Sequence, residues 1–456
     1  MYFIDKTSKI PIYKQLYEAL KQDILQNYKP NQKLPSIRKL ATLYNISKNS
    51  VLRAFYQLEI EGFIEARSKQ GYFVNDINYK EFKPKETHFL PPKPKKYRYD
   101  FFPAHLENST FPHKIWKRLY NKVINEDTDF GSYPDGQGEF ELREQIAIYL
   151  QKSRGANALP QNIVITHGFI DSLNLIAKLL KPKYRYFATE LPGYHIAHKT
   201  FREFGYKISF VDVAKDGIDI NKLKATNAQI VYITPSHQYP LGINMPISKR
   251  LELLEYIKSI NGIILEDDYD SELRYNTQPI PALQGLDEDG RVIYLGTFAK
   301  ALSPAIRVSF ILLPNWLISE YKNHFDSHFC HVSIDTQKTL TAFIKEGYLQ
   351  KHIRRLRNLN RQKHNLMLEA LKEFKDYKVL AKNGGLAIVI APTKPFDWHK
   401  LQYECEKKSI KIYLMKERSG GDIEALRLGF GGLSLDEIPK VIKVLKEPWD
   451  KSFLSS

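Results

Sequence analysis

The sequence is poor in cysteine and has no long apolar runs. Only Cys330 and Cys405 are present among 456 residues, and their wide spacing excludes both a disulfide framework and a zinc-finger pattern. No apolar segment is long enough to cross a bilayer, and the first residues lack a secretory apolar region. These absences predict a protein of the reducing cytoplasm, with no membrane span and no metal site.

Acidic residues are also in short supply. The chain has 51 aspartates and glutamates against 68 lysines and arginines, which gives a formal charge of +17. The surplus is concentrated at the start, because residues 1–98 carry 19 basic and nine acidic side chains. Basic surfaces attract polyanions, so this distribution favours a nucleic-acid partner for the N-terminal part. The length predicts two or three domains.

The N-terminal part, residues 1–76, has the pattern of three short helices followed by two strands. Apolar residues recur every four positions within residues 12–27, as on one face of a helix. Ser36 and Ser47 precede the second and third helical patterns and are expected to cap them. Gly62 ends the third helix, and the stretch "FIEARSKQGYFV" reads as two strands around a polar turn. This order predicts a winged helix-turn-helix domain.

In such domains the third helix enters the major groove of double-stranded DNA. Phosphate contacts set the register of the protein, while side chains such as Asn49 and Arg53 can read base edges. The residues that we expect to contact DNA are Arg38, Lys48, Asn49, Ser50, Arg53, Arg67 and Lys69.

A linker rich in proline and lysine is predicted at residues 77–100. It has no hydrophobic periodicity, and its prolines favour extended polyproline geometry, so we expect a semi-rigid spacer.

From residue 101 to about residue 450 the pattern becomes strand, polar loop and helix, repeated. Near-continuous apolar strands that alternate with helices predict an α/β fold with a doubly wound, mainly parallel sheet. We expect a large subdomain at about 130–320 and a smaller α+β subdomain at about 321–450. Ligands of such sheets bind beyond the carboxyl ends of the strands. Polar clusters follow the strand candidates "NIVIT", "YRYFATE", "QIVYIT", "GIILE" and "RVIYLG".

These strand ends carry the chemistry that pyridoxal phosphate requires. Lys300 supplies an amine that can form an imine with the aldehyde of the cofactor. Asp267 supplies a buried carboxylate for the protonated pyridine nitrogen, and Tyr194 supplies a ring that can stack on the pyridine. Thr297, Arg307 and the backbone amides after the "HG" at a helix start are donors for a phosphate.

The two halves together resemble a known family. The segment "KLPSIRKLATLYNISKNSVLRAFYQLEIEGFIEARSKQGYFV" resembles the GntR-type winged-helix signature. The motifs "TPSHQYPLG", "EDDYDSELRY", "GTFAKALSPAIR" and "LRLGFGGL" resemble fold-type I aminotransferases. With both parts in one chain, the sequence is similar to MocR-type transcriptional regulators of the GntR superfamily.

The resemblance implies roles for individual residues. Lys300 corresponds to the lysine that carries the cofactor as an internal aldimine, Tyr269 to a contact of the ring hydroxyl, and Arg427 to the grip on an effector carboxylate. The expected residues of the pyridoxal 5'-phosphate site are Lys300, Asp267, Tyr269, Tyr194, Thr297, Arg307, Gly168, Phe169, Ile170 and Gln238.

Four positions depart from the family pattern. Ala299 replaces the usual serine before the lysine, and Phe169 and Ile170 replace small or polar residues near the phosphate. The asparagine of the aminotransferase "NPTG" motif is missing, and Tyr239 lies nearest to its position. These changes remove side-chain donors and leave backbone amides.

Two functions remain open at the level of the sequence. We favour a pyridoxal-phosphate-dependent regulator that senses an amino compound, or the cofactor itself, and acts as a homodimer on operator DNA, with RNA polymerase as a further partner. The alternative is a working aminotransferase that carries a DNA-binding domain. Multiple-turnover transamination would distinguish the alternative from the sensor.

Overall fold

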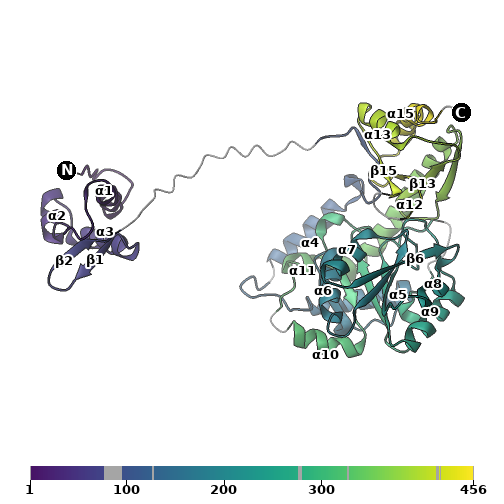
Figure 1. Ribbon diagram of the computed structural model, residues 1–456, viewed down its shortest axis with the longest axis horizontal. Helices are drawn as coiled ribbons and strands as arrows, with labels where there is room; N and C mark the ends of the chain where they lie inside the picture. The colour runs from purple at the N-terminus through teal and green to yellow at the C-terminus, as the bar shows by residue number, and fades with distance from the viewer. Residues whose placement is uncertain are drawn as a thin grey trace. The chain divides into compact units, whose positions relative to one another are not determined.

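The chain divides into two compact units, Met1–Lys93 and Pro94–Ser456 (Figure 1). The computed structural model describes residues 2–76, 95–125, 128–275, 280–325, 328–416, 421 and 423–454. Most of the predicted linker, residues 77–94, lies outside the described residues. Its last residues, 95–100, belong to the second unit, because the Arg98 backbone N–H donates to the Ser409 carbonyl at 2.8 Å.

The first unit is a winged helix-turn-helix, as the sequence predicts. Its two strands pair antiparallel and form the wing. Its elements are α1 (Ile12–Asn27), α2 (Ile37–Tyr44), α3 (Lys48–Ile60), β1 (Ile64–Arg67) and β2 (Gly71–Val74).

Local signals place these helices. The Ser36 hydroxyl accepts the backbone N–H of Lys39, and the Ser47 hydroxyl accepts that of Ser50, so both predicted caps form. Asn45 adopts the left-handed conformation at the end of α2 and turns the chain toward α3. Buried residues of all three helices and the wing form the small core, among them Leu16, Leu20, Leu40, Val51, Phe55, Leu58 and Ile64.

The second unit is built around an eight-stranded sheet in the order β4-β11-β10-β9-β8-β5-β6-β7. Adjacent strands are parallel from β10 through β9, β8 and β5 to β6. The strands are β4 (Ile163–Thr166), β5 (Tyr186–Leu191), β6 (Lys207–Ala214), β7 (Gly217–Ile218), β8 (Ile230–Ile233), β9 (Ile263–Asp268), β10 (Val292–Thr297) and β11 (Ser309–Leu312).

One strand inside this sheet runs the other way. β11 is antiparallel to both β10 and β4, because the chain turns back after β10 through a short segment that contains Lys300 and the 3₁₀ helix Pro304–Ile306. The sequence pattern did not indicate this strand. Its consequence is functional, since the turn between β10 and β11 carries both Lys300 and Arg307 to the same edge of the sheet.

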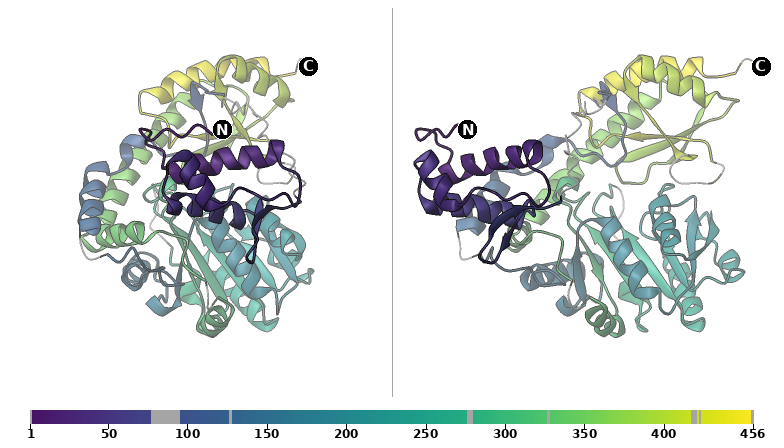
Figure 2. Two further views of the ribbon diagram at one scale, coloured as in Figure 1. Left: turned by 90° about the vertical axis from the view of Figure 1, so that its left-hand side faces the viewer. Right: turned by 60° about the vertical axis from the view of Figure 1, so that its left-hand side comes forward.

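Helices cover both faces of the sheet, which confirms the doubly wound class (Figures 1 and 2). One face packs mainly on α6, α7 and α10. The other packs on α5, α4 and α11 at one end and on α8 and α9 at the other. These helices are α4 (His113–Asn125), α5 (Phe140–Arg154), α6 (Phe169–Leu180), α7 (His195–Glu203), α8 (Ile220–Lys224), α9 (Ile247–Ser259), α10 (Asn315–His324) and α11 (Ile334–Lys345).

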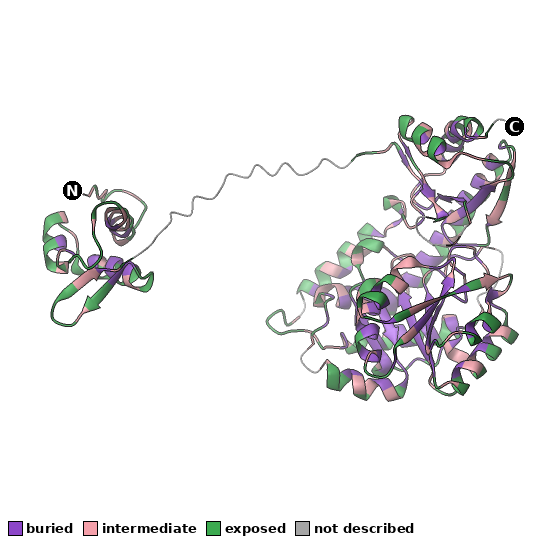
Figure 3. Ribbon diagram, in the orientation of Figure 1, coloured by how far each residue is buried: buried purple, intermediate pink, exposed green. Residues whose placement is uncertain are grey.

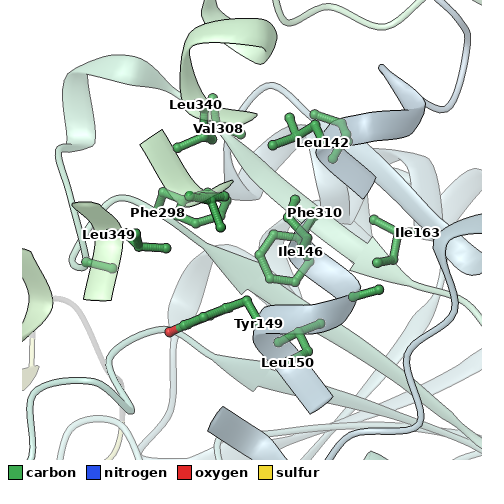
Figure 4. Packing of buried hydrophobic residues seen from close by; sticks show 14 of the residues in the cluster. Leu142, Ile146, Tyr149, Leu150, Ile163, Phe298, Val308, Phe310, Leu340 and Leu349 are labelled. Carbon is green, nitrogen blue, oxygen red and sulfur yellow. The ribbon is translucent and has the colours of Figure 1, made fainter. Parts of the chain in front are cut away.

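Alternation along the strands divides the core between the two faces. In β4, Ile163 and Ile165 point into the cluster beneath α5, while Val164 points into the cluster beneath α6. Figure 4 shows the first of these clusters, in which Ile146 and Phe310 pack together. The strands appear as buried ribbon enclosed by helices in Figure 3.

A smaller four-stranded sheet, in the order β12-β13-β16-β15, lies against α12, α13 and α15. A two-residue strand near the start of this unit, β3, pairs with β14 beside it. The elements are β3 (Tyr99–Asp100), α12 (Tyr348–Leu371), β12 (Tyr377–Ala381), β13 (Ala387–Pro392), α13 (Trp398–Lys407), β14 (Ile410–Lys411), β15 (Tyr413–Leu414), β16 (Leu426–Gly429) and α15 (Glu437–Lys451).

The predicted subdomain boundary near residue 321 remains a prediction. Residues of α11 pack with α4 and α5 beneath the large sheet, whereas Tyr99 and Phe101 pack in the core of the small one. The long helix α12 contributes to both cores through Leu349 and Leu356.

Candidate functional site

A cavity of about 620 Å³ opens at the carboxyl ends of the parallel strands of the large sheet. Residues from β9, the β10–β11 turn, the starts of α6 and α7, and β16 of the small sheet meet in it. The predicted residues that line it are Gly168, Phe169, Ile170, Tyr194, Asp267, Tyr269, Thr297, Lys300, Arg307 and Arg427.

Lys300 reaches the cavity from the turn after β10. Its Nζ atom donates a hydrogen bond to the Pro103 carbonyl at 3.0 Å. Burial disfavours the charged ammonium and lowers the pKa of Lys300 to about 8, although the nearby Asp270 carboxylate acts in the opposite direction. A lysine with a lowered pKa is available as a nucleophile near neutral pH.

Asp267 is the last but one residue of β9, and its carboxyl group is buried in the cavity. The Tyr232 hydroxyl donates to it at 2.5 Å. Burial raises the pKa of Asp267 to about 8, and the Asp268 and Asp270 carboxylates add to this shift. Such a group is suited to bind a buried cation, because a positive partner would restore its charged form.

The neighbouring acid, Asp268, serves another purpose. Strand alternation turns it away from Asp267, where it accepts hydrogen bonds from Arg154 Nε at 2.6 Å and from the Tyr294 hydroxyl at 2.7 Å. Burial alone would raise its pKa, but Arg154 and these hydrogen bonds hold the pKa of Asp268 below its usual value. Asp268 therefore anchors the end of β9 beneath the cavity.

A cradle for an anion forms where α6 begins. Gly168 has a φ of 82° and precedes α6 without a side-chain cap. A Cβ atom at Gly168 would lie 2.2 Å from Arg307 Nη2, so the guanidinium rests directly against this glycine. Beside it, the Thr297 hydroxyl oxygen accepts the Ala299 backbone N–H at 3.1 Å and the Ser309 hydroxyl at 3.0 Å. A helix N-terminus, an arginine and the Thr297 hydroxyl, whose own proton is not used in these bonds, are donors suited to a phosphate.

Aromatic side chains form one wall of the cavity. The ring of Tyr194 meets those of Phe169 and Tyr239 edge-on, at centroid distances of 5.7 and 5.2 Å. The Tyr269 hydroxyl donates to the His237 carbonyl at 3.0 Å, and burial raises the pKa of Tyr269 well above its usual value. Both predicted tyrosines thus line the cavity.

Arg427 enters from β16 of the small sheet and is buried. It donates to the Tyr239 hydroxyl, and its guanidinium lies 4.5 Å from the centroid of that ring. Within the described part of the chain, its buried Nε atom has no hydrogen-bond partner. A buried guanidinium with an unused donor is suited to bind a carboxylate.

Gln238 is the predicted cofactor residue that the structure does not bring to the cavity. It is buried, and its side-chain amide donates to the carbonyls of Pro192 and Tyr239 at 2.9 and 2.7 Å. Its oxygen accepts the Leu241 backbone N–H at 3.2 Å. Gln238 holds the loop after β8 in shape, and Tyr239 rather than Gln238 lines the cavity.

The predicted DNA-contacting residues lie in the first unit, on α2, α3 and the wing. The exposed ones are Arg38, Lys48, Asn49, Arg53 and Lys69.

The other two predicted DNA contacts, Ser50 and Arg67, are partly buried. The Ser50 hydroxyl is 2.9 Å from that of Ser47, within the cap of α3. Arg67 donates to Glu65 at 2.5 Å and to Asn31 at 2.6 Å, so its donors are engaged inside the unit. Lys69 occupies the tip of the wing with a φ of 58°.

Comparisons with known proteins agree with both units. Residues 12–74 match the family model "Bacterial regulatory proteins, gntR family", and residues 103–445 match "Aminotransferase class I and II". The chain is 35% identical to the uncharacterized HTH-type transcriptional regulator YdeL of Bacillus subtilis, over 98% of each protein. It is 30% identical to the probable rhizopine catabolism regulatory protein MocR of Rhizobium meliloti, over 87% of this chain and 85% of that one.

The chain belongs to the MocR-type transcriptional regulators. Among solved structures, this regulator is similar to the kynurenine aminotransferase of Pyrococcus horikoshii, with a TM-score of 0.69 and 26% identity over 78% of this chain and 92% of that one. It is thus a DNA-binding regulator with a fold-type I aminotransferase domain, and its cofactor is pyridoxal 5'-phosphate.

The sequence did not predict two features of the regulator's cavity. Asp270 lines it and accepts a hydrogen bond from His237 Nδ1 at 2.9 Å. The backbone of Pro103, with the neighbouring side chain of His105, closes the cavity from a segment about 200 positions before Lys300. Asp270 is the third acid of the "DDYD" run, so its position just after β9 could have indicated a place in the cavity. No local pattern indicates Pro103.

Among the described residues, no helix is both long enough and apolar enough to cross a membrane. Nor does that part of the chain gather three or more histidine, cysteine or acidic side chains in a geometry that could hold a metal ion.

Proposed function

We propose that this regulator senses a small amino compound, or the cofactor itself, through pyridoxal 5'-phosphate carried by Lys300. The observation that carries the proposal is the meeting of Lys300, Asp267 and Arg427 in one cavity. When bound, the cofactor supplies an aldehyde carbon that reacts reversibly with amines. The three residues supply an amine, a carboxylate for the ring nitrogen and a guanidinium for a carboxylate.

The remaining residues would hold the cofactor in place. We assign the phosphate to the cradle of Gly168, Thr297 and Arg307, together with the backbone amides of Phe169 and Ile170 at the start of α6. The close contact of Arg307 with Gly168 supports this assignment, because both would face the same anion. Ala299 contributes no hydroxyl, but its N–H fixes the orientation of Thr297.

The aromatic residues of the cavity orient the ring and exclude water. We assign Tyr194 to the face of the pyridine ring and Tyr269 to its hydroxyl substituent. Tyr232 holds the Asp267 carboxyl group in position through the 2.5 Å hydrogen bond.

We assign Arg427 to the effector, with its free Nε atom as a donor to a carboxylate. Tyr239 fixes the guanidinium from the side and narrows the cavity next to it. An effector with an amino group and an anionic group would therefore reach the cofactor and Arg427 together. Its binding would change the relative stability of two states of the regulator, as a switch requires.

At the DNA we assign Asn49 and Arg53 to base edges and Arg38, Lys48 and Lys69 to phosphates. A homodimer would present two such units to two half-sites of an operator, in the cytoplasm, with RNA polymerase as the machinery that it controls.

The central experiment measures cofactor absorbance and promoter binding in the same titration. Purified protein is titrated with pyridoxal 5'-phosphate and then with a panel of amino compounds, while absorbance and binding to its own promoter region are recorded. We expect cofactor absorption that is lost in Lys300→Ala, and a change in operator affinity of at least fivefold with one class of amino compound. Lys382→Ala, at the cavity mouth, is the matched control and should keep the absorption.

Two outcomes would contradict the proposal. An unchanged spectrum in Lys300→Ala would show that the cofactor is not held there. Sustained conversion of amino donors to keto acids at enzyme-like rates would establish the aminotransferase function instead.

A further inference from the structure

A strongly basic surface lies outside the cavity, on α4 and the first half of α12. α4 contains four lysines and arginines, and residues 348–364 of α12 contain six, while neither segment has an acidic residue. Eight of these cations are exposed. Two are Lys122 and Arg361, and the other six we call the basic face: Lys114, Lys117, Arg118, Lys351, Arg354 and Arg355.

Side-chain contacts show that the two helices share this surface. Arg118 donates to the Tyr348 hydroxyl at 2.7 Å and lies 5.3 Å from the centroid of its ring. The ammonium of Lys351 lies 5.9 Å from the same ring. One turn further along α12, Arg355 donates to the Thr110 carbonyl at 2.7 Å, just before α4 begins. Arg118 of α4 and Lys351 of α12 are therefore neighbours around the Tyr348 ring.

Little negative charge offsets this cluster. Within the described residues, Arg118 is the one member of the basic face that makes an ion pair, with Glu346 at 3.4 Å. Two lysines of α15, by contrast, form ion pairs with acidic residues of the same helix. Lys446 pairs with Asp450 at 2.6 Å, and Lys451 pairs with Glu447 at 2.7 Å. Unpaired like charges repel one another, so a clustered surface of this kind favours a polyanion.

We propose that the basic face binds the phosphate backbone of duplex DNA that flanks the operator. The inference rests on operator binding by the winged-helix unit. Lysine, arginine and tyrosine side chains are the usual donors to DNA phosphates. The 18 residues at 77–94 can span at most about 60 Å, so DNA held by the first unit is present at high effective concentration around the second.

The test compares two charge-matched variants of the full-length protein. The first carries Lys114→Gln, Lys117→Gln, Lys351→Gln and Arg354→Gln, and spares the two arginines that bond within the unit. The control removes four exposed lysines elsewhere on the second unit: Lys199→Gln, Lys378→Gln, Lys440→Gln and Lys443→Gln.

Each protein is titrated with two duplexes over a range of salt concentrations. One is the shortest promoter duplex that the wild type binds, and the other extends it by about 40 base pairs on each side, longer than a 60 Å reach. We expect the first variant to lose roughly tenfold or more in affinity for the long duplex. The slope of log affinity against log salt should fall by about 0.9 for each phosphate contact removed. Its affinity for the short duplex, and both affinities of the control, should match the wild type.

Every other outcome overturns the inference in a recognisable way. Equal losses on both duplexes would place the basic face in operator binding itself or in the fold. Unchanged affinity for the long duplex, with altered transcription by purified RNA polymerase, would assign the face to an acidic protein surface. Failure of the wild type to bind either duplex would refute operator binding, and the inference with it.

Discussion

Lys300 and Asp267 illustrate how burial alone prepares a site. Removal from water disfavours the charged form of each, so the pKa of the lysine falls and that of the carboxyl group rises, both to about 8. At pH 7 roughly one tenth of the Lys300 amine is unprotonated, against about 0.03% for a lysine in water. The two side chains are therefore poised for an aldehyde and for a protonated ring nitrogen.

This shift predicts the pH dependence of cofactor attachment. The ammonium form of Lys300 predominates below its pKa and cannot attack, so the rate of attachment to cofactor-free protein should rise about tenfold per pH unit below pH 8. Above pH 8 the rate should level off. Stopped-flow absorbance with added pyridoxal 5'-phosphate measures it between pH 6.5 and 9.5. Asp267→Asn should keep the same midpoint, whereas a midpoint near 10 would contradict burial of the amine.

Arg427 is expected to bind the carboxylate of the effector. Arg427→Gln should weaken the response to carboxylate-containing amino compounds by roughly tenfold to a hundredfold, because a charged hydrogen-bonding partner is lost. The absorption of the Lys300-bound cofactor should remain. Spectral titration of both proteins gives the ratio, and Tyr239→Phe should show a smaller effect in the same assay. An unchanged response in Arg427→Gln would remove this residue from the effector site.

At the scale of elements, the site is assembled by the ends of strands and the starts of helices. β9 presents Asp267, the β10–β11 turn presents Lys300 and Arg307, and the β4–α6 turn presents Gly168. Each turn is short, so a side chain at its end has little freedom to leave the cavity. The antiparallel strand β11 matters most, because it fixes both ends of the turn that carries the lysine and the arginine.

Gly168→Ala tests the anion cradle. A methyl group there would lie 2.2 Å from Arg307 Nη2 and would sit on a backbone with a φ of 82°, so the guanidinium must move. Affinity for pyridoxal 5'-phosphate should fall roughly tenfold or more, since a charged contact is weakened, while affinity for pyridoxal, which has no phosphate, should change little. Fluorescence titrations with the two ligands measure the ratio.

The control for this substitution is Gly131→Ala, at a glycine outside the left-handed region and outside the cavity. It should bind both ligands as the wild type does. Equal losses of pyridoxal and pyridoxal 5'-phosphate in Gly168→Ala would show a general defect of the cavity rather than of the cradle.

At the scale of the whole molecule, the two units have separate functions, DNA binding and cofactor binding. The first has a core of its own, drawn from three helices and the wing, and the second encloses the cofactor cavity.

Two exposed aromatic rings stack on the surface of the second unit. The centroids of Tyr133 and Phe329 are 4.4 Å apart, and the residues are 77% and 46% exposed. Apolar surface of this kind favours a contact with another protein.

We expect this aromatic pair to lie in the interface of the proposed homodimer. Phe329→Glu should shift the protein toward monomer, with a dissociation constant raised at least tenfold, because a charge would be buried against an apolar partner. Sedimentation velocity at several concentrations measures the shift. Phe210→Glu, at a ring of similar exposure on β6, is the matched control and should sediment as the wild type does. A dimer of unchanged affinity in Phe329→Glu would place the interface elsewhere.

The sequence by itself determined the two-unit plan, the class of each fold and the cofactor. Cap residues, strand periods and motif spacing are local, and they placed α1 to α3, five strands of the sheet, and Lys300 and Asp267 at strand ends. The tertiary structure alone decided which side chains meet. The side chain of Gln238 bonds within its own loop, while Asp270 and the Pro103 carbonyl line the cavity. Cations of α4 and α12 lie on one surface. These contacts join residues far apart along the chain or turn on the rotation of one side chain, so no local pattern encodes them.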